Sequence, residues 1–185
     1  MTIKDVVITA ATYLGMEGVA EYLEKETSAD DGVLSAVNVL TRCANYTLNE
    51  IAANYIPMIN VERANAENGK IYFSCLQKTP LRIINVTDDY GEKQYFKFYP
   101  EYLAVASGYA VIEYSYIPAN YALTEEIGYK ESDITPRVIA LGAASEYCLT
   151  ERAFDDSVTF RQRFNDALSE LCPVRNSHVR GRRFV

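Results

Sequence analysis

Few side chains in this sequence have the types and spacing that catalysis or metal binding requires. The one histidine, His178, lies in the C-terminal segment, so a histidine metal site or a Ser-His-Asp triad would need residues from another chain. The acidic pairs Asp88-Asp89 and Asp155-Asp156 could ligate a metal, but turn formation and helix capping explain them more simply. The scattered glycines form no phosphate-binding loop. We therefore expect no enzymatic activity, metal or cofactor, since an enzyme would have to use carboxylates and a metal alone.

The four cysteines are Cys43, Cys75, Cys148 and Cys172, and no two of them form a CxxC pair. Three lie in apolar helical or strand patterns, and the last lies at a predicted helix end. A free cysteine behaves as a small hydrophobic residue. We therefore expect reduced core cysteines rather than disulfides or a metal site.

The chain has 185 residues and a net charge of −7, which is unevenly distributed. Residues 173–185 contain four arginines and no Asp or Glu, which leaves 14 Lys and Arg against 25 Asp and Glu elsewhere, a net charge of −11. An acidic body disfavours nonspecific binding to nucleic acid, because basic patches supply that affinity. The sequence shows no secretory signal and no apolar run of about 20 residues, so we expect a soluble cytoplasmic product without membrane contact.

The spacing of apolar residues predicts helices in the first third of the chain. A helix capped by Thr2 is followed by a short helix over about 17–25. Asp30 or Asp31 caps the longest helix, which runs to about Tyr55. Its apolar stripe is long enough to require more than one partner helix.

Residues 69–118 are rich in Tyr, Phe, Ile and Val, with turn residues between short runs, which predicts β-strands. Meandering strands without an intervening helix favour a small antiparallel sandwich or barrel-like insert over a parallel sheet. The candidate strands are 71–76, 81–87, 95–99, 103–105 and 109–117, with 88–91 as a hairpin loop.

After the insert, residues 119–135 form a long polar and aromatic loop, and loops of that length are uncommon without a partner or a function. Pro136 then begins a helix, in which the Gly-Ala-Ala-Ser segment 142–145 offers a small-residue face for close approach of another helix. A last helix ends at Cys172-Pro173. We expect the N- and C-terminal helices to pack together.

The predicted fold is α+β, a helical bundle formed by N- and C-terminal helices with an inserted small antiparallel β domain and an extended C-terminal arm. The boundaries are 1–68 for the N-terminal helices, 69–118 for the insert, 119–135 for the loop, 136–172 for the C-terminal helices and 173–185 for the basic arm.

Tyrosines crowd the insert and the loop that follows it. Core packing and β propensity would explain them, but tyrosine is also enriched at protein interfaces, and the sequence leaves both explanations open. Both faces of the segment 109–116 are aromatic, and a small insert cannot bury both, so some of these side chains should contact a partner. The candidate interface residues are Tyr95, Tyr99, Tyr102, Tyr109, Tyr114, Tyr116 and Tyr121.

The arm is basic and ends in two apolar residues. Its candidate docking residues are Arg175, Arg180, Arg182, Arg183, Phe184 and Val185. A solvated tail, or one that binds nucleic acid, would also be basic. The apolar end favours docking on an acidic, partly apolar protein surface over these two alternatives.

Six stretches of the sequence share a pattern with one group of proteins. They are Ala143-Ala144-Ser145-Glu146-Tyr147-Cys148-Leu149, Phe154-Asp155-Asp156, Arg161-Gln162-Arg163-Phe164, Arg182-Arg183-Phe184-Val185, Tyr99-Pro100-x-Tyr102-Leu103 and Tyr114-x-Tyr116-x-Pro118. Together with the layout of helices around a β insert, they resemble tailed-bacteriophage head-to-tail adaptor (connector) proteins, similar to the tail tubular protein A group of short-tailed phages.

The resemblance implies a structural virion protein that is not an enzyme. Such adaptors form a ring, typically of twelve copies, which binds the portal protein, extends the DNA channel and presents a platform for the downstream tail or nozzle protein. DNA would pass through without sequence-specific binding. In related adaptors the C-terminal segment reaches onto the portal, and here that role would fall to the docking residues of the arm. The protein would be made in the host bacterial cytoplasm and located in the neck of the virion.

Two other functions stay open on the sequence alone. Another phage neck or tail-completion protein could share this layout. A small nucleic-acid-binding or regulatory protein would use the basic arm differently, and salt-dependent DNA binding would distinguish it.

Overall fold

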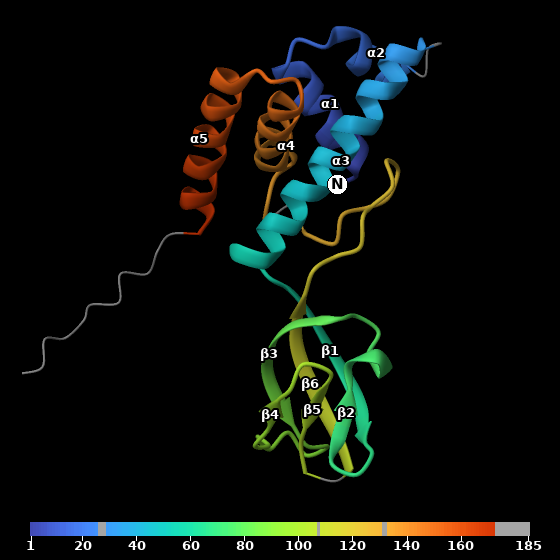
Figure 1. Cartoon of the computed structure of the whole chain (residues 1–185), viewed down its shortest axis with the longest axis vertical. Coiled ribbons are helices and arrows are strands. Elements are labelled where there is room, and N and C mark those ends of the chain that lie inside the picture. Colours follow the sequence, from blue (N-terminus) through green and yellow to red (C-terminus); the bar gives the residue numbers. More distant parts are fainter. Residues whose placement is uncertain (26–28, 107, 131–132, 173–185) are drawn as a thin grey trace, which may run out of the picture.

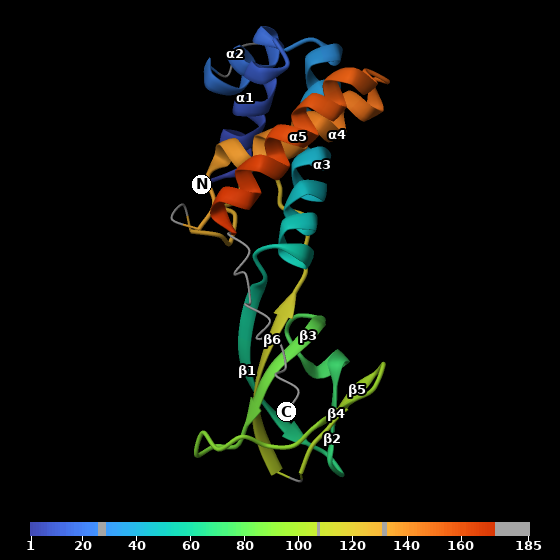
Figure 2. The same cartoon turned by 90° about the vertical axis from the view of Figure 1, so that its left-hand side faces the viewer.

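A computed structural model describes residues 1–25, 29–106, 108–130 and 133–172. The described chain has a helical unit, residues 1–57 and 119–172, with a β insert, residues 58–118, at one end of an elongated molecule (Figures 1 and 2). This confirms the predicted α+β fold. The helices are α1 (Ile3–Tyr13), α2 (Glu17–Lys25), α3 (Asp31–Asn54), α4 (Pro136–Thr150) and α5 (Phe154–Leu171).

Local capping explains where the helices start. The Thr2 hydroxyl accepts a hydrogen bond from the Asp5 N–H, and the Asp5 carboxylate accepts one from the Thr2 N–H at 2.8 Å, which completes a capping box for α1. That backbone bond lowers the pKa of the Asp5 carboxyl. Asp30 Oδ1 accepts from the Val33 N–H at 2.7 Å and caps α3. Pro136 occupies the first turn of α4, as predicted.

Helix α4 is the centre of the helical unit, and α1, α3 and α5 pack around it. A Cβ atom at Gly142 would collide with the Thr47 methyl group of α3 and lie 3.1 Å from the Phe164 ring of α5. Ser145 and Ser157 exchange two hydroxyl-to-carbonyl hydrogen bonds of 3.0 Å, which join α4 to α5. The predicted small-residue face therefore contacts helices on two sides.

Helix α3 is covered by three other helices, α1, α2 and α4, which confirms that its stripe needs more than one partner. Its 24 residues extend over about 36 Å. Arg161 of α5 also reaches α3, where its guanidinium donates hydrogen bonds of 2.8 and 2.6 Å to the Glu50 carboxylate. This bidentate pair ties the outermost helix to the longest one.

The insert consists of two three-stranded antiparallel sheets, with strand orders β1-β6-β3 and β2-β5-β4. Both sheets contribute to one small core, which includes Val86 and Ile112 from the first sheet and Ile71 and Leu103 from the second. The predicted sandwich-like insert is therefore present. Its strands are β1 (Met58–Ala66), β2 (Lys70–Tyr72), β3 (Pro80–Thr87), β4 (Lys97–Phe98), β5 (Tyr102–Ala104) and β6 (Gly108–Tyr116), with a 3₁₀ turn at Phe73–Cys75.

The insert begins at Met58 and not at residue 69, so the predicted boundary is wrong. Strand β1 pairs along its whole length with β6, from Met58 opposite Tyr116 to Ala66 opposite Gly108. The Asn68-Gly69 dipeptide is the hairpin turn from β1 to β2, with φ of 52° and 73° at its two residues. These positive φ values define a type I′ turn, for which Asn-Gly is the preferred sequence.

Two other strand predictions are shortened in the structure. The strand predicted over 71–76 ends at Tyr72 and continues as the 3₁₀ turn, and the strand predicted over 95–99 is limited to β4. The turn at 88–91 is present, because Asp88 Oδ1 accepts hydrogen bonds from the N–H groups of Tyr90 and Glu92. The chain then crosses to the second sheet, where β4 pairs with β5 and not with β3.

The long loop between the insert and α4 packs against the helical unit. Its Leu123 carbonyl accepts a hydrogen bond of 2.8 Å from the Lys4 N–H at the start of α1. Asn45 of α3 binds the backbone of Tyr121 twice, since its Oδ1 accepts from the Tyr121 N–H at 2.7 Å and its Nδ2 donates to the Tyr121 carbonyl at 3.0 Å. The partner that such a loop requires is therefore the protein's own helical unit.

Candidate interaction surfaces

The seven candidate interface tyrosines divide into two groups. Three are exposed, namely Tyr95, Tyr99 and Tyr109, and Tyr102 is half-buried beside Tyr99. Three pack against the hydrophobic cores, namely Tyr114, Tyr116 and Tyr121. Tyr95 is 80% exposed, whereas Tyr114 is fully buried, so the interface prediction is wrong for Tyr114. The partly buried Tyr116 contacts both cores and has a structural role as well.

Tyr114 lies at the centre of a hydrogen-bond network inside the insert. Its hydroxyl donates to Glu62 Oε2 at 2.9 Å and accepts from Asn60 Nδ2 at 3.0 Å and from the Lys78 N–H at 3.3 Å. The Glu62 carboxylate also accepts from the Gln77 N–H. Burial raises the pKa of the Tyr114 phenol. The network therefore anchors the segment that leads into β3.

Two tyrosines of the long loop fix the connection between insert and helical unit. The Tyr129 hydroxyl donates a hydrogen bond of 2.6 Å to the Ile56 carbonyl, at the end of α3. The Tyr121 hydroxyl lies 3.9 Å from the Met58 sulfur, at the start of β1. Burial raises the pKa of both phenols. Tyr121, a candidate interface residue, is thus half-buried and makes an internal contact through its hydroxyl.

The β2-β5-β4 sheet carries a face made of lysine and tyrosine side chains, here named the Lys-Tyr face: Lys70, Tyr72, Lys97, Tyr99 and Tyr102. The rings of Tyr99 and Tyr102 are stacked, with centroids 4.7 Å apart and planes inclined by 17°. Tyr72 lies opposite Tyr102 in the register, with centroids 5.7 Å apart. The Lys70 ammonium is 4.8 Å from the Tyr102 ring centroid.

Three members of the Lys-Tyr face, Lys70, Tyr72 and Lys97, were missed by the sequence prediction. The signal was the alternation in Lys70-Ile71-Tyr72, where the middle residue is buried and its neighbours point to the other side of the sheet. A three-residue strand is too short for this alternation to stand out from the sequence. Only the pairing of β2 with β5 brings Tyr72 beside Tyr102.

The exposed Tyr109 lies on the other sheet, in a cluster with Arg63 and Asp89. The Arg63 guanidinium lies 4.1 Å from the Tyr109 ring centroid and donates hydrogen bonds of 2.8 and 2.6 Å to the Asp89 carboxylate. Asp88 forms the adjacent turn, so both members of this acidic pair have structural partners. The predicted turn formation is confirmed for Asp88, whereas Asp89 pairs with Arg63.

The second acidic pair, Asp155-Asp156, lies in the first turn of α5. Neither side chain makes a capping hydrogen bond, and the cap position is Ala153. The predicted capping bond is therefore wrong, although both carboxylates lie at the end of the helix that the macrodipole makes favourable for negative charge.

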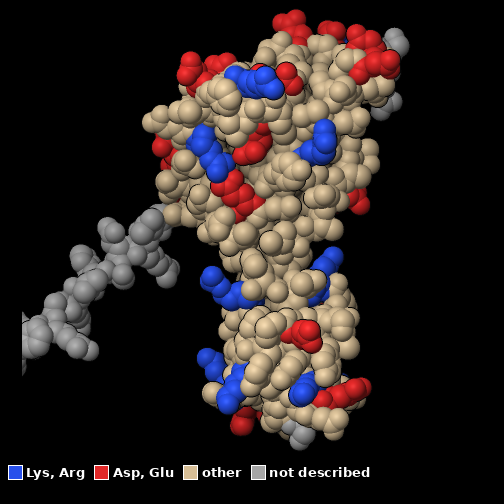
Figure 3. Space-filling view, viewed as in Figure 1, with Lys and Arg blue, Asp and Glu red and all other residues tan. Residues whose placement is uncertain are grey.

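Charge differs strongly between the two parts of the molecule. The helical unit contains eight Lys and Arg against eighteen Asp and Glu, a net charge of −10, whereas the insert contains six against seven, a net charge of −1. Figure 3 shows acidic side chains gathered at the end of the helical unit remote from the insert. The acidity predicted for the whole body therefore belongs almost entirely to the helical unit, including its loops.

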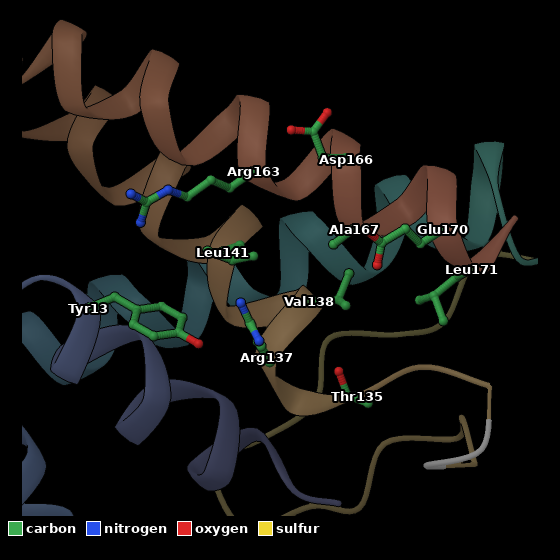
Figure 4. A pocket seen from close by; sticks show the side chains of 10 residues that line it. All are labelled: Tyr13, Thr135, Arg137, Val138, Leu141, Arg163, Asp166, Ala167, Glu170 and Leu171. Atoms are coloured by element: carbon green, nitrogen blue, oxygen red, sulfur yellow. The ribbon is translucent and has the colours of Figure 1, made fainter.

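The arm and its candidate docking residues Arg175, Arg180, Arg182, Arg183, Phe184 and Val185 lie outside the described residues. Helix α5 ends beside a groove of about 580 Å³ between α1, α4 and α5 (Figure 4). Val138 and Leu141 of α4 form part of its apolar lining. Its charged lining is mixed, with two basic and two acidic side chains: Arg137, Arg163, Asp166 and Glu170. The groove therefore favours neither sign of ligand charge.

The chemically reactive groups of the described part are few. Cys43 and Cys148 are buried, Cys172 is half-buried, Cys75 is exposed, and all four are free thiols. Burial raises the pKa of the Cys43 thiol to about 11. Within residues 1–172, apart from the three short gaps, no three His, Cys, Asp or Glu side chains are grouped as metal ligands.

No helix of the described chain combines the length and the apolar character that crossing a membrane requires. A search of protein-family models and a search of curated proteins both found no match to this sequence.

Proposed function

We propose that this protein is a head-to-tail adaptor of a tailed bacteriophage, a structural protein that forms a ring, typically of twelve copies, in the neck of the virion. The ring binds the portal protein through the basic arm and extends the DNA channel. The insert meets the downstream tail or nozzle protein. DNA passes through the ring without sequence-specific binding, and no catalytic step is assigned to the chain.

The observation that carries the proposal is the division of the chain into three parts that differ in charge and composition. The helical unit has a net charge of −10, which repels the DNA backbone and suits the wall of a DNA conduit. The insert stands apart at one end of the molecule, where it can reach a second body (Figure 1). The arm adds four arginines and an apolar end, which suits docking on an acidic protein surface. A chain with two separated contact regions can join two other components.

Removal of the arm tests the proposal. Full-length protein and a variant that lacks residues 175–185 are each mixed with the portal of the same phage and imaged by negative-stain electron microscopy. The full-length protein should add a ring at the narrow end of the portal, and the truncated protein should add none while its circular dichroism and urea unfolding remain unchanged. The truncation should leave the fold intact, because all the described contacts lie within residues 1–172.

A matched variant separates the charge of the arm from its apolar end. Replacing Phe184 and Val185 by serine keeps all four arginines, and replacing the four arginines by glutamine keeps the apolar pair. Both variants should weaken portal binding if the arm docks as proposed. Full binding by the truncated protein, or salt-dependent DNA binding by the full-length protein that the truncation removes, would overturn the proposal in favour of a different neck role or a nucleic-acid-binding function.

A further inference from the structure

The Lys-Tyr face differs from an ordinary solvent face in its composition. The strands β2, β4 and β5 contain no Asp or Glu, and the nearest acidic residues in the sequence, Glu67 and Glu101, lie in the turns beside them. The inward side chains Ile71 and Leu103 are buried in the core of the insert. The outward side therefore presents two ammonium groups and three phenol hydroxyls, with the Glu67 carboxylate at its edge, since Glu67 lies opposite Lys70 in the hairpin.

Apart from the contact between the Lys70 ammonium and the Tyr102 ring, the polar groups of this face have no partner within the described chain. The hydroxyls of Tyr72, Tyr99 and Tyr102 make no hydrogen bond to any residue that the structure describes, in contrast to those of Tyr114 and Tyr129. The ammonium groups of Lys70 and Lys97 likewise form no ion pair there. Each of these groups can donate hydrogen bonds, and the two lysines outnumber the Glu67 carboxylate beside them, so the face is an array of donors with a small net positive charge.

The arrangement of the rings limits what the face can bind. Tyr102 is contacted by Tyr99 on a stacked ring, by Tyr72 and by the Lys70 ammonium. The Tyr102 ring is therefore covered by its neighbours and is not an open platform for a planar ligand. Proteins that bind single-stranded nucleic acid need open aromatic faces on which bases stack. The donor groups instead match carboxylates, which accept hydrogen bonds from both phenols and ammonium groups.

We infer that the Lys-Tyr face docks an acidic segment of the downstream tail protein, through carboxylates that meet Lys70 and Lys97 and accept from the tyrosine hydroxyls. This inference rests on the proposed function for the identity of the partner. The position of the face supports it, because the insert lies at one end of the molecule and away from the helical unit (Figures 1 and 2). Tyrosine also contributes more than most residues to protein interfaces.

A charge reversal on the face tests its ligand chemistry in the isolated protein. The probe is a short peptide that alternates Glu and Ala, and binding is followed by two-dimensional amide NMR of the full chain at low salt. The peptide should shift resonances of β2, β4 and β5, and a peptide with Gln in place of Glu should not. The variant Lys70→Glu/Lys97→Glu should bind about tenfold more weakly or worse. The matched control Lys78→Glu/Lys93→Glu, which makes the same charge change elsewhere on the insert, should bind as the unaltered protein does.

Other outcomes would overturn the inference. Equal binding by the two variants, or peptide shifts confined to other elements, would show that the face does not select carboxylates. Tighter binding of a single-stranded oligothymidine to the same strands would make it a nucleic-acid surface. Concentration-dependent sedimentation that only the Lys70→Glu/Lys97→Glu variant loses would make a second copy of this chain the occupant.

Assembly on the portal tests the partner and separates the two proposals. The Lys70→Glu/Lys97→Glu variant should add a ring to the portal as well as the unaltered protein does, but the resulting complex should fail to recruit the tail protein. If neither protein adds a ring, the proposed function fails while the peptide result stands by itself. If both add a ring and both recruit the tail protein equally, only the inference about the Lys-Tyr face fails.

Discussion

The helical unit and the insert use the same kinds of side chain in opposite ways. In the helical unit, mainly aliphatic side chains close a core around α4, and charge remains outside as an acidic surface. In the insert, the core is small and several aromatic side chains remain on its surface, including Tyr72, Tyr95 and Tyr99. A two-layer insert of this size can bury one face of each sheet only, so the remaining aromatic side chains are available for contacts.

The tyrosines show this difference most directly. Tyr114, Tyr121 and Tyr129 are packed, and their hydroxyls have protein partners. Those of the Lys-Tyr face have none among the described residues. The first group therefore contributes to stability, and the second group is available for the contact that we propose for the Lys-Tyr face.

The largest expected effect concerns two phenylalanines of α5. Phe164 is fully buried and Phe154 is 61% exposed on the same helix. Phe164→Ala should lower the free energy of unfolding by about 3–5 kcal/mol, because it leaves a cavity beside α4. Phe154→Ala should change it by less than about 0.5 kcal/mol. Urea unfolding of both variants measures the difference, and similar losses would show that α5 does not pack as described.

The next effect concerns two helical glycines. Gly142→Ala should lower the free energy of unfolding by about 1–3 kcal/mol, because the new methyl group would overlap Thr47 and press on Phe164. Gly18→Ala in α2 meets only Val33 at an ordinary 3.7 Å and should stabilise by about 0.4–1 kcal/mol, since alanine loses less backbone entropy. Thermal unfolding of the two variants should show stability changes of opposite sign, which would distinguish the close contact at α4 from an open helix face. A gain in stability at Gly142 would contradict the close approach.

An effect of similar size distinguishes the two groups of tyrosines inside the insert. Tyr114→Phe removes one hydroxyl and leaves Glu62 and Asn60 without that partner, which should lower the free energy of unfolding by about 1–3 kcal/mol. Tyr102→Phe removes a hydroxyl that has no described partner and should change stability by less than about 0.5 kcal/mol. Urea unfolding gives the stability of each variant. Binding of the Glu-Ala peptide should weaken more in Tyr102→Phe than in Tyr114→Phe.

The smallest expected effect is a loss of stability that appears only at alkaline pH. Burial raises the pKa of Tyr129 in the folded state, whereas an unfolded tyrosine loses its proton near pH 10. Above that value the folded state holds more protons than the unfolded state, so the free energy of unfolding should fall as pH rises from 10 through the raised pKa. Below about pH 9 this tyrosine should cause no pH dependence.

Urea unfolding between about pH 8 and about pH 11 measures this decline. Tyr129→Phe should make the decline shallower, and the exposed Tyr95→Phe should leave it unchanged. An identical decline in both variants would assign the pH dependence to other groups.

Sequence patterns located the helices accurately because capping and amphipathic spacing are local properties. Thr2, Asp30 and Pro136 mark helix starts in the sequence and occupy those positions in the structure. The small-residue segment of α4 likewise predicted close helix contact, since a residue without a side chain at Gly142 lets the neighbouring helices approach. The α+β class followed from the spacing of apolar residues, which has a helical period at both ends of the chain and a strand period between them.

The beginning of the insert was missed for a physical reason. Residues 58–66 carry Glu62, Arg63 and Asn65 among their apolar residues, which weakens the strand pattern. The strand exists because β6 provides a partner along its whole length, and that partner lies about 50 residues away in the sequence. Asn68-Gly69 was the local signal that the two runs form a hairpin.

By itself, the sequence determined which segments are helical, where charge is concentrated and that a β insert interrupts the helices, because these follow from neighbouring residues. Only the tertiary structure decided which tyrosines are buried. Alternation places Tyr114 and Tyr116 on one side of β6, but it does not say which side meets the second sheet or the long loop. Tyr72 also joins Tyr99 and Tyr102 only in the folded protein. Strand pairing brings these side chains together, and their spacing in the sequence does not predict it.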